Sequence, residues 1–204
     1  MWLASDTCRA SCEIQSDRSP AKYEKKPVKN SAAPIAKPLT AATAWLRVSA
    51  DAKQPIGPEF QLLDAASPTQ NGEHRAGALY DVVSAGDSPA LPWGEFHEAR
   101  IVSRGPLLEH WLDGVLVASA DTSTPEWAAL VEDSKFKGVD GFAASGPGRL
   151  LIQDHGDEVW IRGMRVRELS GGGQVGTPLF SSGDTAGWSN VGDARYEVQG
   201  TTLI

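Results

Sequence analysis

Short runs in which apolar and polar residues partly alternate dominate the chain from Trp45 onward. Period-two alternation is typical of half-buried strands, and clusters of turn residues separate the runs. The predicted strands are WLRVSA (45–50), PEFQLLD (58–64), GALYDVV (77–83), FHEARIVSRG (96–105), LLEHWLDGVLVASA (107–120), RLLIQDH (149–155) and EVWIRGMRVREL (158–169). Many short strands of this kind predict an all-β fold, an antiparallel β-sandwich.

One stretch, residues 122–138, has the signals of a short helix instead. Ser123 or Thr124 can cap its first turn, and Pro125 then stands near the first helical position, where its missing N–H costs nothing. Gly138 is the predicted end. We therefore expect one short helix inserted among the strands.

The two ends of the chain differ from this middle part. Residues 1–44 carry seven Lys and Arg against four Asp and Glu, whereas the other 160 carry twelve against twenty-two. A Pro-, Lys- and Ala-rich stretch without a strand or helix period predicts a disordered segment. Residues 170–178, SGGGQVGTP, have the composition of a flexible linker. Residues 179–204 resume strand-like patterning and predict the start of a second unit.

Composition narrows the class of partner. The net charge of −7 argues against nucleic acid, because phosphate binding needs a basic surface. No apolar run approaches the roughly 20 residues that span a bilayer, and the N-terminus lacks the basic and apolar regions of a signal peptide. Seven Trp against five Phe and three Tyr suit either core packing or stacking on sugar rings.

Two of the predicted strands carry polar residues at face-sharing positions. In PEFQLLD, Glu59 and Gln61 share one face of an extended strand while Phe60 takes the other. A solvated surface and a ligand-facing surface both fit this pattern. In GALYDVV, Tyr80 is either a proton-transfer group on a sheet face or a residue of the core rim.

The stretch LLEHWLDGVLV (107–117) adds a histidine and a turn. Asp113-Gly114 predicts a type I′ hairpin, since this dipeptide tolerates positive φ. His110 and Trp111 then point to opposite faces. His110 is either a hydrogen-bonded sheet histidine or a general base.

The stretch LLIQDHGDEVWIRGMRVREL (150–169) predicts a second hairpin. Period-two counting places Gln153, His155 and Arg162 on one face across its two strands. Three acids, Asp154, Asp157 and Glu158, fall at or near the turn, where carboxylates are ordinarily solvated or accept backbone N–H groups. The spacing contains no HxH or HxxxH pair that would fix a metal site, and no GxSxG occurs.

These segments resemble the 3-keto-disaccharide hydrolase family, also described as 3-keto-glucoside lyase and 2-hydroxy-3-keto-glucal hydratase. GPEFQLLD, AGALYDVV, GEFHEARIVSRGPLLEHWLDGVLV, SKFKG and LLIQDHGDEVWIRGMRVREL occur in the family's order and approximate spacing, from about residue 45 to 169. The resemblance implies a concanavalin/laminin-G-like jelly-roll sandwich. It also implies a bacterial, exported carbohydrate enzyme.

Two departures from the family pattern concern the ends. Residues 1–44 stand where members have an opening strand pair and a GNSG-like stretch, and we hypothesise a miscalled or frame-shifted start. Residues 179–204 resemble that missing opening, placed after the domain. A tandem parent protein would explain this order. The alternative is that the terminal piece completes the first sandwich by permutation.

The resemblance also implies a reaction. The ketone at C3 of the sugar acidifies the C2 proton, a base removes it, the C1 substituent leaves and water adds. This chemistry needs a base, an acid and donors or a cation for the enolate. The candidates are His155, then His110, as base, and Tyr80 or Glu59 as acid. Sugar or enolate contacts fall to Gln61, Gln153, Arg162, Trp111 and Trp160. A divalent metal ion would fit as electrophile, through the histidines and a carboxylate.

Two other interpretations compete with the enzyme. A concanavalin-like sandwich can be a carbohydrate-binding module, in which Trp93, Trp111 and Trp160 stack on sugars, because fold does not fix function. The chain can also be an inactive fragment with an open sheet edge. Turnover of a 3-keto-glycoside separates these interpretations.

Overall fold

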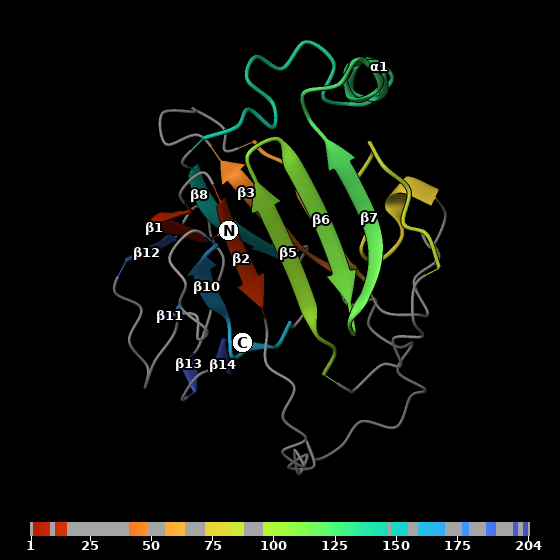
Figure 1. Cartoon of the computed structure of the whole chain (residues 1–204). Coiled ribbons are helices and arrows are strands. Elements are labelled where there is room, and N and C mark those ends of the chain that lie inside the picture. Colours follow the sequence, from red (N-terminus) through yellow and green to blue (C-terminus); the bar gives the residue numbers. More distant parts are fainter. Residues whose placement is uncertain are drawn as a thin grey trace.

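The computed structural model describes residues 2–8, 11–15, 41–48, 56–63, 72–87, 96–146, 148–154, 159–169, 177–179, 187–190, 198–199 and 202–203. Two antiparallel sheets form the body of the molecule (Figure 1). One short helix lies at the end of the sandwich where β7 finishes. The predicted all-β sandwich with one helix is therefore confirmed.

The five-stranded sheet has the order β12-β1-β8-β3-β4, with β12 (Trp188–Asn190), β1 (Trp2–Cys8), β8 (Gly148–Asp154), β3 (Ala41–Val48) and β4 (Glu59–Leu63). The six-stranded sheet has the order β11-β10-β2-β5-β6-β7, with β11 (Thr177–Pro178), β10 (Arg165–Glu168), β2 (Ser11–Gln15), β5 (Ala99–Arg104), β6 (Leu107–Leu112) and β7 (Val115–Asp121). A small third sheet joins β13 (Val198–Gln199), β14 (Thr202–Leu203) and β9 (Ile161–Arg162). The remaining elements are the 3₁₀ turn η1 (Gly72–His74) and the helix α1 (Pro125–Glu132).

The core between the two large sheets follows from strand alternation. Phe60, Leu150 and Ile152 of the five-stranded sheet are buried in one cluster with Ile101 and Leu112 of the six-stranded sheet. Burying an aliphatic or aromatic side chain of this size contributes about 1.5–3 kcal/mol. Because alternate residues of a strand point to opposite faces, the neighbours of Phe60 on β4 face away from this core.

A second apolar cluster fixes the helix and the segment after it. Trp127 of α1 is buried with Leu79, Leu108 and Phe136. The ring of Phe136 also stacks on that of Phe142, with centroids 4.1 Å apart. The cluster thus anchors residues 134–143 against the 72–87 segment and the edge of the six-stranded sheet.

The helix begins as predicted and ends earlier. The Thr124 side chain accepts a hydrogen bond from the Trp127 backbone N–H, and Pro125 opens the first turn. The cap at the other end is Asp133, so the predicted end at Gly138 is wrong. Gly138 has a φ of +72° in a later turn, where its lack of a Cβ is needed.

The Asp113-Gly114 hairpin is confirmed. It joins β6 to β7, and both residues have positive φ, +45° and +79°. This is the conformation that a type I′ turn requires.

The predicted strand 77–83 is wrong. Asp81 has a φ of +62°, so the chain turns back there and leaves single bridges from Leu79 to Phe60 and to Val83. Left-handed backbone at a non-glycine residue interrupts a strand, and Asp is one of the residues that tolerates it.

The predicted hairpin within residues 150–169 is also wrong. Strand β8 pairs with β1 and β3, whereas β9 pairs with β14 and β10 pairs with β2 and β11. Gly163, with a φ of +61°, separates β9 from β10 and lets the chain change sheets. Arg162 therefore does not meet Gln153 across a hairpin.

The ends of the chain also differ from expectation. Strands β1 and β2 lie within residues 1–44, where the sequence predicts disorder, and β3 begins at Ala41. Beyond residue 170, β11 pairs with β10 at the edge of the six-stranded sheet, and β12 pairs with β1 at the edge of the five-stranded sheet. The predicted domain division, and the alternative in which the terminal piece completes the first sandwich, stay predictions. The tandem parent and the displaced start stay predictions.

A buried arginine ties the two sheets together. Arg47 of β3, at a register irregularity with a φ of +53°, donates through Nε and Nη2 to the hydroxyl oxygen of Ser103 on β5, at 3.0 and 2.8 Å. Its other hydrogen bonds go to the carbonyl oxygens of Ala143 and Gly105. A Cβ on Gly148 would lie 2.5 Å from the Arg47 Cα, so glycine is required there.

Within the described part of the chain, no helix has the length and apolar character needed to cross a bilayer.

Candidate functional site

A row of polar side chains crosses three strands of the five-stranded sheet. The register pairs Gln61 of β4 with Thr43 of β3, and Thr43 with Gln153 of β8. The Thr43 hydroxyl donates to the Gln61 side-chain carbonyl oxygen at 3.4 Å. Strand alternation puts this row, with Glu59, on the face opposite Phe60. The sequence prediction that Glu59 and Gln61 share a face is thus confirmed, and Gln153 joins them.

Three of these polar residues are buried rather than solvated. Thr43, Gln61 and Glu59 are each less than a tenth exposed, and Gln153 is half-buried. Polar side chains are seldom buried unless they are paired, because desolvation costs free energy. Plain solvent exposure of Glu59 and Gln61 is therefore wrong, and the ligand-facing interpretation stays a prediction.

The centre of the site is an ion pair. The Lys135 Nζ lies 2.7 Å from the Glu59 Oε1, and the Lys135 side chain is 46% exposed against 5% for Glu59. Burial raises the pKa of Glu59 above its usual value, while the Lys135 ammonium opposes part of that rise and the nearby Asp81 adds to it. A carboxyl group that keeps its proton more readily than usual is suited to acid catalysis.

Two aromatic rings hold the ammonium group in place. The Lys135 Nζ lies 4.1 Å from the centre of the Tyr80 ring and 4.8 Å from that of Phe136. Cation–π contacts of this length attract the ammonium group to the faces of the two rings. Tyr80, a predicted acid, is thereby brought to the Glu59–Lys135 pair, and its backbone N–H donates to the Glu59 carbonyl oxygen at 3.0 Å.

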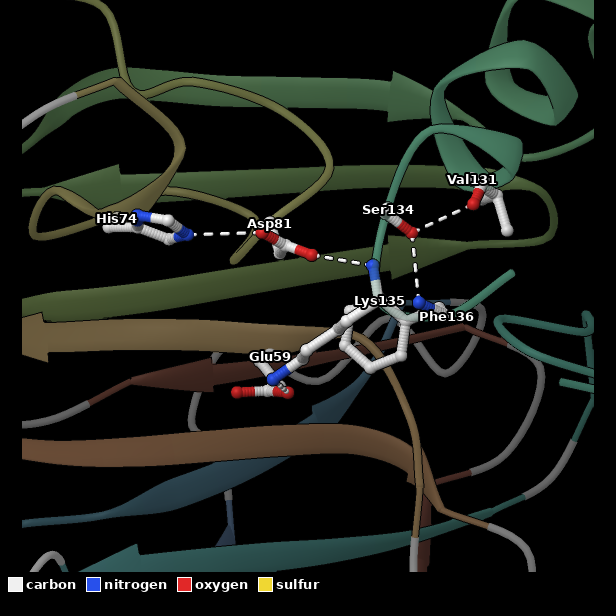
Figure 2. A network of polar contacts seen from close by, with 7 residues as sticks. All are labelled: Glu59, His74, Asp81, Val131, Ser134, Lys135 and Phe136. Carbon is white, nitrogen blue, oxygen red and sulfur yellow. Dashed lines mark hydrogen bonds and ion pairs between the residues drawn. The ribbon is translucent and has the colours of Figure 1, made fainter. Parts of the chain in front are cut away.

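Asp81 fixes the backbone that carries Lys135 (Figure 2). Its Oδ2 accepts from the Lys135 backbone N–H at 2.6 Å, and its Oδ1 lies 3.0 Å from the His74 Nε2. Burial alone would raise the pKa of Asp81, but these contacts outweigh it and hold the pKa below its usual value. Ser134 adds a local brace, donating to the Val131 carbonyl oxygen and accepting from the Phe136 N–H.

His110 lies in the core between the sheets, at 1% exposure. Its Nδ1–H donates to the Gly77 carbonyl oxygen at 3.1 Å, and its ring lies 4.6 Å from that of Phe60. Burial lowers its pKa to about 4, so the ring is neutral at pH 7. These surroundings favour the hydrogen-bonded sheet histidine, one of the two interpretations that the sequence left open.

The other predicted base, His155, lies outside the described residues, next to the end of β8 at Asp154. The turn acids Asp157 and Glu158, and Trp93, lie outside them as well. Their roles stay predictions.

The remaining predicted sugar contacts are dispersed. Trp111 follows His110 and so points out of the opposite sheet, where its Nε1 donates to Glu109 and its ring stacks under Arg100. The Arg162 guanidinium lies 3.7 Å from the centre of the Phe96 ring. Trp160 is half-buried just before β9. The structure does not bring Trp111 to the face that bears Glu59.

Sequence reasoning missed Thr43, His74, Asp81 and Lys135. Thr43 lies in the segment for which the sequence predicts disorder, and His74 lies in the 3₁₀ turn η1. Asp81 lies in the wrongly predicted strand 77–83, and Lys135 lies in the stretch 122–138 that the sequence predicts to be helical. The SKFKG segment (134–138) carries no signal beyond the family resemblance.

Candidate metal ligands do not cluster in the described residues. No three His, Cys, Asp or Glu side chains among them lie close enough together to hold a metal ion. A site that included His155 would fall outside this part of the chain.

Comparison with known proteins supplies the context. One curated relative, named 3-keto-disaccharide hydrolase, from Bacteroides thetaiotaomicron, is 29% identical over 137 residues, which covers 58% of this chain and 47% of the relative. The chain thus spans about half the length of this relative.

Solved structures agree on the fold. A candidate glycosyl hydrolase from Parabacteroides distasonis superposes with a TM-score of 0.56 at 18% identity, covering 82% of this chain and 70% of that one. A second from the same species gives a TM-score of 0.51 at 18% identity, covering 82% of both. At this identity the likeness concerns fold alone.

A family profile decides the assignment. The profile described as 3-keto-alpha-glucoside-1,2-lyase-like domain matches residues 25–167, which include the whole of β3, β4 and β8 with the polar row and the Glu59–Lys135 pair. It begins earlier than the predicted domain start at residue 45. This match covers more than half of the chain, and the chain belongs to the family of 3-keto-alpha-glucoside-1,2-lyase-like domains.

Proposed function

We propose that this domain cleaves 3-keto-glycosides by removing the C2 proton, eliminating the C1 substituent and hydrating the product. The family assignment and the name of the Bacteroides relative support the substrate class. Carbohydrate chemistry supports the route, because a ketone at C3 makes the adjacent C2–H the acidic bond of the sugar.

The steps balance without a redox partner. A base takes the C2 proton, and the bonding pair forms the C2=C3 enolate with its charge on the C3 oxygen. The enolate then restores the C3 ketone, C1=C2 forms and the C1–O bond breaks, with a proton delivered to the leaving oxygen. Water finally adds, its hydroxyl to C1 and its proton to C2.

The observation that carries the proposal is the environment of Glu59. A carboxyl group with raised pKa stands on a sheet face beside Gln61, in contact with a half-exposed cation and near a tyrosine. Expulsion of a sugar alkoxide needs an acid, and burial raises the pKa of Glu59 in the direction that suits this role. We therefore assign the acid role to Glu59.

The other roles follow the same face. Gln61 and Gln153, which lie on either side of Thr43 in the polar row, can donate to sugar hydroxyls. His155 stays our proposed base, two residues beyond Gln153 in the sequence. His110 is a weaker candidate, since a buried ring hydrogen-bonded to Gly77 offers the substrate no approach in this conformation.

The test is product formation from 3-keto-trehalose and 3-keto-glucosides with an activated leaving group, compared with the unoxidised sugars. We expect Glu59→Gln to lower kcat by about 10²–10⁴, the usual range for general acid catalysis. The loss should shrink for good leaving groups, because these need no proton. Glu109→Gln, on the other sheet, is the matched control and should keep its activity.

The alternatives give different results. Tight sugar binding without turnover, unchanged in His155→Ala, would identify a carbohydrate-binding module. An insoluble or unfolded chain that a longer parent rescues would identify a fragment. Turnover of the unoxidised glycosides at similar rates would refute the 3-keto requirement.

A further inference from the structure

Lys135 is the strongest feature that the proposed function leaves without a role. We propose that Lys135 is a catalytic cation whose ammonium group binds the C3 oxygen of the enolate and then neutralises the Glu59 carboxylate. This inference rests on the proposed function and adds to it the group that carries the charge between its two steps.

The placement of the amine supports contact with a substrate. The Lys135 side chain is 46% exposed while its partner Glu59 is 5% exposed, so the cation lies on the solvent side of the buried carboxyl. An ammonium group has three N–H donors, and one directed at the Glu59 Oε1 leaves others for a ligand oxygen.

The position of the amine is also defined before any ligand arrives. The Tyr80 and Phe136 rings lie 4.1 and 4.8 Å from the Nζ, measured to the ring centres. A preorganised cation stabilises a developing negative charge without the cost of reorienting solvent, and this effect supplies much of the rate enhancement of many enzymes. The rings keep the charge in place while leaving N–H groups available to a partner.

The main chain beneath the amine is held as firmly. Asp81 accepts from the Lys135 N–H at 2.6 Å and is itself held by His74. The residue after Lys135, Phe136, packs in the apolar cluster with Trp127 and Leu79. We assign Asp81 a positioning role: it fixes where the side chain starts and touches no reacting atom.

The charge follows the two chemical steps. When the C2 proton leaves, the new negative charge on the C3 oxygen pairs with the Lys135 ammonium. When the C1–O bond breaks, the C3 ketone is restored and the proton of Glu59 passes to the leaving oxygen. The negative charge then lies on Glu59, which is already in contact with Lys135. One cation thus serves both anions, and no proton leaves the amine.

A purely structural ion pair is the competing explanation. In that case Lys135 would hold the 134–136 segment to β4, and its loss would lower stability without a specific effect on the enolisation step. Loss of Lys135 leaves the buried Glu59 carboxyl without its partner, so stability can fall under both explanations, and only the rate of enolisation per folded molecule separates them.

The experiment isolates enolisation from elimination. A 3-keto sugar without a substituent at C1 cannot eliminate, yet its C2 proton exchanges with deuterium oxide when the enzyme forms the enolate. We expect Lys135→Met to slow C2 exchange per folded molecule by about 10²–10³, the usual cost of removing one oxyanion donor. Lys135→Arg keeps the charge and should retain part of the exchange. Lys137→Met, which removes an exposed lysine paired with Glu132, is the control.

Rescue distinguishes a chemical from a structural role. Methylammonium added to Lys135→Ala should restore C2 exchange in proportion to its concentration, and tetramethylammonium, which has no N–H, should not. Exchange in Lys135→Met within about threefold of the wild type, or loss of exchange only in step with unfolding, would overturn the inference.

Failure of the proposed function looks different. If the wild-type protein neither exchanges C2 nor cleaves any 3-keto-glycoside, the proposed function fails first, and with it the role of Lys135. If the wild type is active and Lys135→Met is too, only the inference fails.

Discussion

The side chains of Arg47 and Lys135 differ in solvent exposure and in the groups that they contact. Arg47 is 8% exposed, and in the described part of the chain its hydrogen bonds go to neutral oxygens of Ser103, Ala143 and Gly105. Lys135 is half exposed and contacts a buried carboxyl group. Burial lowers the pKa of Arg47 from its usual value, yet its guanidinium remains charged at any physiological pH.

The difference separates structure from chemistry. A buried guanidinium whose three nitrogens all donate to sheet and loop oxygens is closed to a ligand, so Arg47 joins the two layers. An ammonium group open to solvent, in contact with a buried carboxyl group whose pKa burial raises, can respond to charge that develops on a substrate. Substitutions of Arg47 and of the residues packed on it should therefore change the free energy of unfolding. Substitutions of Lys135 and of the residues that position it should change kcat.

The largest effect should come from Arg47→Met. This substitution leaves the buried oxygens that accept hydrogen bonds from the guanidinium without a donor. We expect the free energy of unfolding to fall by about 3 kcal/mol. Urea denaturation measures this. The kcat per folded molecule should stay within about twofold. A loss of unfolding free energy below about 1 kcal/mol, or a loss of kcat at unchanged stability, would contradict a purely structural role for Arg47.

His110, like Arg47, should contribute to stability, and it makes the free energy of unfolding depend on pH. Its pKa is about 4 in the folded protein against 6.5 when exposed, a difference worth about 3 kcal/mol. The unfolded chain binds the extra proton, so stability is full above pH 6.5 and falls as the pH drops toward 4. Denaturation at pH 7 and pH 5 tests this. His110→Asn should lose that slope, and an equal slope in the variant would contradict the assignment.

Gly148→Ala tests the packing of β8 against the Arg47 backbone on β3. The added Cβ would lie 2.5 Å from the Arg47 Cα, and overpacking of this kind costs about 1–3 kcal/mol. Thermal unfolding should show a lowered melting temperature. Gly86→Ala is the matched control, because Gly86 also lacks a positive φ and its new Cβ would lie 3.6 Å from the Val117 carbonyl oxygen, an ordinary contact.

The smallest effect should come from Asp81→Asn on the Lys135 side. The amide keeps an acceptor for the Lys135 N–H but loses the charge that His74 contacts. We expect kcat to fall about tenfold, equivalent to about 1.4 kcal/mol, with KM little changed. A change in KM alone would mean that Asp81 acts on binding rather than on the position of the amine.

The same division explains what the sequence could predict. Alternation along β4 correctly placed Glu59 and Gln61 on one face, because that strand is regular and half of it packs on the core. The family motif and the helix cap at Thr124 were equally local and equally recognisable.

Non-local pairing defeated the rest. The 150–169 hairpin was wrong because β8 takes β1 and β3 as neighbours, and Gly163 sends the chain to other sheets. Lys135 was missed because a turn segment, positioned by a carboxylate 54 residues earlier, brings it to Glu59. Such contacts follow from packing, which no periodicity records.

A double-mutant cycle on kcat for a 3-keto-glycoside, with Glu59→Gln, Lys135→Met and the pair, tests whether these two residues act as one unit. Groups that share a single charge lose their coupling when either is removed, so effects should be strongly non-additive. We predict that the double variant is no more than about threefold slower than the slower single variant. Losses that multiply would show that Glu59 and Lys135 work independently and would contradict the shared cation.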